Sequence, residues 1–107
     1  MKYRRSDEFK RDYKNLKPEH QKAFREVVLD KFAPACVAWA TAAESQLPYV
    51  WPASLRVAAL RNTDRIIEMT WSFASPDGRA SFQIKHLDGE WFCVWRRIGD
   101  RGLYTSP

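Results

Sequence analysis

Apolar and polar residues alternate through the last third of the chain. Residues 67–73 (IEMTWSF) and residues 79–85 (RASFQIK) each place an apolar side chain at every second position, which is the period of a strand with one buried face. Residues 91–98 (WFCVWRRI) are apolar at odd and even positions alike as far as Val94, which favours a strand in the interior of a sheet. The pattern therefore predicts three consecutive strands.

Two short segments between these runs predict tight turns. Residues 75–78 (SPDG) contain Pro, which presets φ at about −65°, and Gly, which accepts positive φ; Asp88-Gly89 is a second turn signal. Strands joined in this way form an antiparallel meander with one apolar face. The other face carries a carboxylate, hydroxyls, an amide and cations, so we expect the chemistry of the protein there.

The first half of the chain has the longer period of helices. Ser6 is a plausible N-cap, and apolar residues at positions 9, 13 and 16 share one face of a short helix. Pro18 suits the first position of a second helix, because Pro lacks an N–H that the first turn does not use. Pro34 is expected to end or kink that helix, and residues 35–44 are good helix formers that continue it.

Two further segments are also predicted to form strands. Residues 2–5 (KYRR) suggest a short edge strand, and alternation in residues 55–60 (LRVAAL) suggests a strand ahead of the meander. The order of elements predicts an α+β fold in which two N-terminal helices, the second kinked or extended, pack on a small antiparallel sheet. The 107 residues suffice for a single domain, residues 1–107.

Charge and cysteine content narrow the function classes. Lys and Arg number 18 against 13 Asp and Glu, a net charge of +5 that favours a polyanionic partner such as nucleic acid or an acidic protein. Cys93 lies between two tryptophans in an apolar run, so a buried free thiol is expected rather than a disulfide or metal ligand. Without an apolar leader or membrane-length run, we expect a cytoplasmic protein that does not contact a membrane.

The polar face of the meander is the best candidate site. No phosphate-binding loop, nucleophile elbow or metal-ligand spacing occurs, so neither a metal nor another cofactor is expected. Alternation and the polar chain end supply these candidates: Arg56, Glu68, Arg79, Lys85, Arg96, Arg97, Arg101 and Tyr104. Strand parity alone leaves open which of Arg96 and Arg97 faces the site. It also leaves open whether the arginines bind a ligand or pair with local carboxylates.

These residues resemble a known family. Residues 6–16 (SDEFKRDYKNL), 51–57 (WPASLRV), 68–73 (EMTWSF), 76–80 (PDGRA) and 95–104 (WRRIGDRGLY) resemble, in order, motifs of a short RelE-like branch of the RelE/ParE superfamily of type II toxins. The resemblance spans nearly the whole chain. It implies the same two-helix and antiparallel-sheet fold that the periodicity predicts.

The resemblance also implies an activity. It suggests a toxin that cleaves messenger RNA on the ribosome without a metal and is held inactive by a cognate antitoxin. By position, Arg79, Arg101 and Tyr104 match residues that surround the scissile phosphate, and Glu68 occupies a strand position where relatives carry a carboxylate or lysine. Arg56, Lys85, Arg96 and Arg97 are then expected to bind RNA. One departure is that relatives often have histidine where this chain has Arg101.

Two other functions stay open at this point. A ParE-like toxin would poison DNA gyrase and cut no RNA, because fold alone does not fix function. A degenerate member would only bind RNA or a partner protein.

Overall fold

The structure, a computed structural model, describes residues 1–60, 63, 65–71 and 78–99. In this part of the chain the strands form one sheet in the order β1-β5-β4-β3-β2. The strands are β1 (Lys2–Arg5), β2 (Ala58–Ala59), β3 (Ile67–Trp71), β4 (Gly78–Leu87) and β5 (Glu90–Gly99). The helical segments are α1 (Asp7–Lys14), α2 (Pro18–Val27), the π-helical turn η1 (Val28–Phe32), α3 (Ala33–Glu44) and the 3₁₀ turn η2 (Ala53–Leu55).

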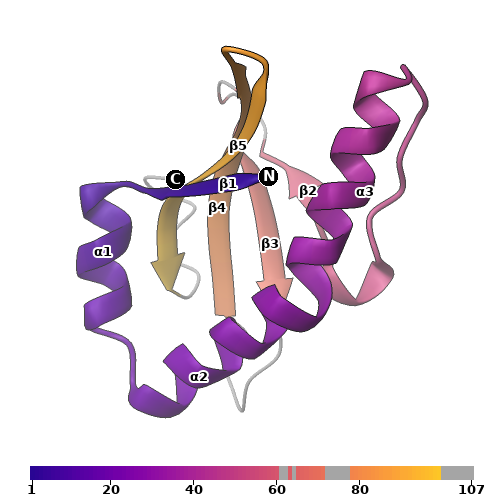
Figure 1. Cartoon of the computed structure of the whole chain (residues 1–107). Coiled ribbons are helices and arrows are strands. Elements are labelled where there is room, and N and C mark those ends of the chain that lie inside the picture. Colours follow the sequence, from indigo (N-terminus) through magenta and orange to yellow (C-terminus); the bar gives the residue numbers. More distant parts are fainter. Residues whose placement is uncertain (61–62, 64, 72–77, 100–107) are drawn as a thin grey trace.

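The helices cover one face of the sheet, as the α+β prediction requires (Figure 1). Three phenylalanines from successive helical segments, Phe9, Phe24 and Phe32, meet Trp95 of β5 with ring centroids 5.8, 5.3 and 4.8 Å apart. All four rings are buried. Burial of large aromatic side chains is the main stabilising contribution between the two layers.

Local signals in the sequence correctly mark where the first two helices begin. The Ser6 hydroxyl accepts a hydrogen bond from the Phe9 N–H at 3.0 Å, which caps α1 as predicted. The same hydroxyl donates to the Arg96 carbonyl at 2.7 Å and so ties the start of α1 to β5. Pro18 occupies the first turn of α2, also as predicted.

The second helix continues past Pro34, which confirms the predicted extension. The irregularity lies just before the proline, where the Ala33 N–H donates to the Val28 carbonyl, five residues back instead of four. Such a π-helical turn takes up the mismatch in the hydrogen-bond ladder that a proline creates. α3 then runs to Glu44 without a break.

The antiparallel meander is also confirmed. β3 pairs with β4, and β4 pairs with β5, in antiparallel registers. Asp88 and Gly89 have φ of 51° and 78°, the left-handed conformation that a two-residue hairpin turn requires at both positions. Residues 75–77 of the other predicted turn lie outside the described residues.

Two details of the predicted sheet are wrong. Residues 55–60 do not form a continuous strand, because η2 ends at Leu55 and Arg56 adopts a left-handed conformation with φ of 45°. Among the described residues of this segment, the two residues of β2 pair with β3. The sheet is mixed rather than antiparallel, since β1, which the sequence predicts as an edge strand, pairs with β5 in parallel.

The cysteine thiols are buried between α3 and the sheet. Cys36 and Cys93 are both free thiols, not joined in a disulfide, and both are fully buried, which confirms the prediction for Cys93. Burial, with a smaller contribution from hydrogen bonding to Cys36, raises the pKa of Cys93 well above the value of an exposed thiol.

Burial of the Cys93 thiol predicts that the free energy of unfolding falls at alkaline pH. The folded state keeps the Cys93 proton at pH values where the unfolded chain loses it, above about pH 8.5, so the free energy of unfolding falls as pH rises. One such thiol contributes a slope of about 1.4 kcal/mol per pH unit. Urea unfolding at about pH 8 and about pH 10 should therefore give a shallower pH slope for Cys93→Ala than for the native chain. Equal slopes would show that this thiol does not titrate differently in the two states.

Candidate functional site

The polar face of the meander lies on the side of the sheet opposite the helices. Glu68 is the register partner of Ser81, and Thr70 is the partner of Arg79, so these four side chains share one face. Trp71, one residue on from Thr70, points to the other face and packs on the ring of Phe24 in α2 at 5.1 Å. The sequence alternation therefore assigned the two faces of β3 and β4 correctly.

This polar face is more enclosed than the predicted half-buried strands imply. Glu68 and Thr70 are each 5% exposed, and Ser81 is fully buried. Alternation of polar residues normally signals solvent on one face, so burial on both faces is a finding that periodicity missed.

Glu68 and Arg79 form the central ion pair of the site. Arg79 Nη1 donates to Glu68 Oε1 at 2.9 Å, between residues on neighbouring strands. The Glu68 side chain is 7% exposed and the Arg79 side chain 20%. The adjacent guanidinium offsets part of the free-energy cost of burying this carboxylate, so removal of either charge is destabilising. Two of the predicted catalytic residues are thus in direct contact.

A β-bulge determines where Arg96 points. Ser81 pairs with Arg97 while the next residue, Phe82, pairs with Trp95, so Arg96 is the extra residue on β5. Arg96 Nη1 donates to Gln83 Oε1 at 3.2 Å, which places its guanidinium beside the polar face of β4. The sequence left open which of Arg96 and Arg97 faces the site, and the bulge together with this contact brings Arg96 to it.

Arg97 is engaged by the helical layer. Its Nε and Nη2 donate to the two carboxylate oxygens of Asp12 at 2.6 and 3.1 Å, and the Ile98 N–H donates to the same carboxylate at 3.2 Å. The hydrogen bond to Asp12 raises the pKa of Arg97. The sequence did not indicate Asp12 as a site residue, because a carboxylate in an amphipathic helix gives no signal of a partner 85 residues away.

The other predicted site residues are distributed differently. Lys85 lies exposed farther along the polar side of β4. Arg56 does not join this face, because it lies in the left-handed turn before β2 and not in a strand paired in register. Arg101 and Tyr104 lie outside the described residues.

The described residues give no metal centre. Within them no group of three or more His, Cys, Asp and Glu side chains is arranged to hold an ion. None of the helices among them is long and apolar enough to span a membrane.

Comparison with known proteins identifies no relative. No protein-family model, curated protein or solved structure matches the chain. Functional inference therefore depends on the geometry of the polar face and on the resemblance in the sequence motifs.

Proposed function

We propose that this protein is a type II toxin of the RelE-like kind that cleaves messenger RNA on the ribosome without a metal. The observation that supports the proposal is the contact between Glu68 and Arg79, a carboxylate and a guanidinium 2.9 Å apart on a sheltered sheet face. The motif resemblance matches Arg79 to an arginine near the scissile phosphate, and it puts Glu68 at a strand position where relatives carry a carboxylate or a lysine. A potential proton acceptor and a potential phosphate ligand from neighbouring strands therefore lie side by side.

The proposed reaction is attack of a ribose 2′-hydroxyl on the adjacent phosphate. Glu68 accepts the proton of the hydroxyl, the 2′-oxygen forms a bond to phosphorus, and the bond from phosphorus to the 5′-oxygen breaks. Arg79 stabilises the additional negative charge on the phosphorane oxygens, which a planar guanidinium contacts with two N–H groups. The products are a 2′,3′-cyclic phosphate and a 5′-hydroxyl.

The ion pair between Glu68 and Arg79 affects when Glu68 can act as a base in this reaction. Arg79 bonds Glu68 before RNA arrives, so a phosphate that binds Arg79 competes with the carboxylate for the same donors. This competition would release Glu68 to act as a base only when substrate is present. Tyr104 is proposed to donate the proton to the leaving 5′-oxygen, and Arg101 to hold the phosphate together with Arg79.

Binding of RNA is supported by the other cations near this face. Arg96 lies beside Gln83 on the polar side of β4, and Lys85 is exposed two residues farther along that strand. Together with the net charge of +5, these groups favour a polyanion. A cognate antitoxin, the ribosome as the site of action and a cytoplasmic location belong to the same proposal.

A binding-only role is the second candidate. The Glu68 side chain is only 7% exposed, and a buried ion pair is often a structural element of a sheet. In that case the protein would bind RNA or a partner protein, or would poison DNA gyrase, with the pair intact.

Mapping of RNA ends tests the proposal. The native chain, Arg79→Ala and the control Arg25→Ala, which removes an exposed cation of α2, would each be expressed from an inducible promoter. Native chain and control should arrest growth and produce new 5′ ends within ribosomal A-site codons. Arg79→Ala should reduce cleavage on the order of a hundredfold.

Other outcomes would contradict the nuclease proposal. Growth arrest with a DNA-damage response and no new RNA ends would favour gyrase poisoning. Harmless expression of the native chain would favour the binding-only role. Cleavage that persists in folded Arg79→Ala would remove Arg79 from the site.

A further inference from the structure

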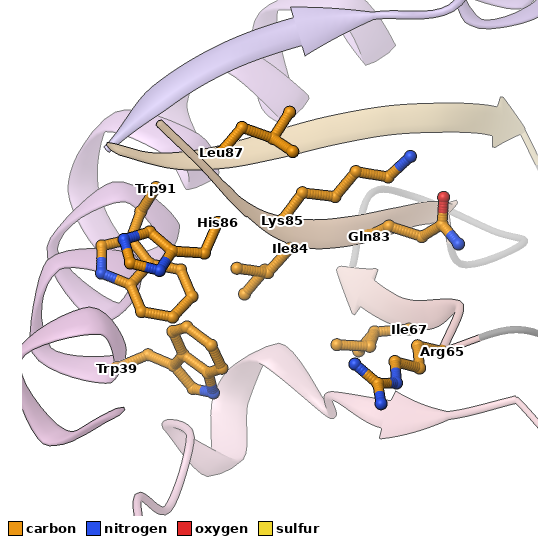
Figure 2. Close-up of a pocket in the computed structure, with 9 residues that line it drawn as sticks. All are labelled: Trp39, Arg65, Ile67, Gln83, Ile84, Lys85, His86, Leu87 and Trp91. Carbon is orange, nitrogen blue, oxygen red and sulfur yellow. The ribbon is translucent and has the colours of Figure 1, made fainter. Parts of the chain in front are cut away.

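A small cavity lies near the turn of the β4–β5 hairpin, on the sheet face that points away from the helices. It has a volume of about 240 Å³ and an apolar and charged lining, all in the described part of the chain: Leu87, Phe92, Val94, Arg4, Asp88 and Glu90. Phe92 and Val94 have the opposite parity to Trp95, which packs on Phe32 of the helical layer, so they point to the other face. Figure 2 likewise shows Leu87 extending from β4 on the side opposite Ile84 and Trp39.

Arg4 forms the cationic wall of this cavity. Its guanidinium carbon lies 5.2 Å from the centroid of the Phe92 ring, a cation–π contact that fixes the position of the charge. In the described ranges no carboxylate pairs with Arg4, so its N–H donors can bind a ligand. Phe92 itself is buried, whereas Leu87 is 53% exposed and offers an apolar surface at the rim.

The two carboxylates of the cavity differ in their partners. Glu90 forms an ion pair with Lys2 at 3.0 Å. Asp88 is exposed in the hairpin turn, and none of the described residues bonds its carboxylate. Arg4 and Asp88 therefore line one cavity with opposite charges but do not pair with each other. A ligand that uses both must present hydrogen-bond acceptors to the guanidinium and donors to the carboxylate.

These requirements narrow the class of ligand. A simple anion would be repelled by Asp88 and Glu90, and a simple cation by Arg4. The volume is smaller than the roughly 300–1,000 Å³ of cavities that hold drug-sized ligands, so a single planar ring system fits better than a larger molecule. Guanine has acceptors at O6 and N7, which arginine binds with two N–H groups, and donors at N1 and the 2-amino group, which suit one carboxylate. The other three RNA bases lack two adjacent donor groups on one edge.

We propose that this cavity binds a guanine base, with Arg4 donating to O6 and N7 and Asp88 accepting from N1–H and the 2-amino group. The base belongs either to single-stranded RNA or to a free guanine nucleotide, which share these edges. Arg79 and Leu87 lie near opposite ends of β4, roughly 25 Å apart at about 3.3 Å per residue, so the cavity is separate from the pair of Glu68 and Arg79. The inference therefore goes beyond the proposed nuclease function and does not depend on it.

Titration of the ¹⁵N-labelled chain with nucleoside monophosphates, followed by amide shifts, tests the site. Guanosine monophosphate should shift amides within residues 87–94 and bind at least about tenfold tighter than the adenosine, cytidine or uridine nucleotide. Two 2′-O-methylated pentanucleotides, UUGUU and UUAUU, identify the source of the base and cannot be cleaved through the 2′-oxygen. A preference for UUGUU over UUAUU would assign the base to RNA, whereas binding of guanosine monophosphate without that preference would assign it to a free nucleotide.

Ligands that lack single groups test each proposed contact. The 7-deaza analogue of guanosine monophosphate lacks N7, so it should bind the native chain roughly tenfold weaker but bind Arg4→Met as well as guanosine monophosphate does. Inosine monophosphate lacks the 2-amino group and should show the same behaviour with Asp88→Gly. Methionine keeps an apolar side chain beside Phe92, and glycine suits the φ of 51° at position 88, so both variants retain the local fold.

Arg5→Met provides the matched control. It removes the same charge from the next position of β1, whose side chain points to the other face, and should change the binding of guanosine monophosphate by less than about twofold. Circular dichroism would verify that all variants fold. The proposal would be overturned if guanosine monophosphate did not bind, or if all four nucleotides bound equally. A loss in Arg5→Met as large as that in Arg4→Met, or a 7-deaza effect that persists in Arg4→Met, would overturn it as well.

Discussion

Replacement of Arg79 by Met is expected to lower the free energy of unfolding by about 3–5 kcal/mol. The apolar side chain leaves the Glu68 carboxylate, 7% exposed, without the guanidinium that lies 2.9 Å from it. Chemical denaturation would measure the change. The exposed pair of Glu8 and Arg11, 3.8 Å apart, provides the control, and Arg11→Met should cost less than about 1 kcal/mol.

A double variant separates stability from activity at this pair. Glu68→Leu combined with Arg79→Met removes both charges, and should recover most of the stability that Arg79→Met alone loses. If the pair is catalytic, the double variant folds but neither arrests growth nor cuts RNA. A stable double variant that remains toxic would leave the pair with a structural role only.

Truncation of Phe32 to Ala should cost about 3–5 kcal/mol of the free energy of unfolding. Phe32 is fully buried where the helix turns at η1, and its ring lies 4.8 Å from Trp95 and 5.0 Å from Phe82. The variant therefore opens a cavity between the helical layer and the sheet. In the same π-helical turn Leu29 is 72% exposed, so Leu29→Ala should change stability by less than about 0.5 kcal/mol.

Comparison of the single variants Phe32→Ala and Leu29→Ala tests how much the packing of Phe32 against the sheet contributes to stability. Urea unfolding of both proteins gives the comparison. Similar small losses would mean that the contacts of Phe32 with the two sheet rings contribute little.

Most of the fold was predictable because its signals are local. The cap at Ser6, the proline that starts α2 and the Asp88-Gly89 turn each act within a few residues. Alternation in β3 and β4 similarly reports which side chains share a face. Each such feature is encoded by the residue types themselves.

The wrong predictions concern features of the sheet that depend on residues far apart in the sequence. The partner of β1 is β5, about 90 residues away, and nothing in the local pattern specifies a parallel pair. In residues 55–60 the alternation was present, but a left-handed turn at Arg56 limits pairing to β2. The bulge at Arg96 likewise depends on register with β4 and not on its own sequence.

In the candidate site, too, some contacts could be predicted from the sequence and others could not. Contact between Glu68 and Arg79 follows from alternation on adjacent strands, so the residues could be selected from sequence. Engagement of Arg97 by Asp12 requires the packing of helix α1 against the sheet. Tertiary contacts of this kind have no periodic signature.

Parallel pairing of β1 with β5 also constrains how the protein is made. Lys2 pairs with Phe92 and Arg5 with Trp95, so β1 can join the sheet only after the chain has been synthesised as far as β5, about 90 residues later. Such sequence-distant closure slows folding because the loop entropy must be overcome first. A shortened product that stops before β5 therefore leaves β1 without its neighbour in the sheet.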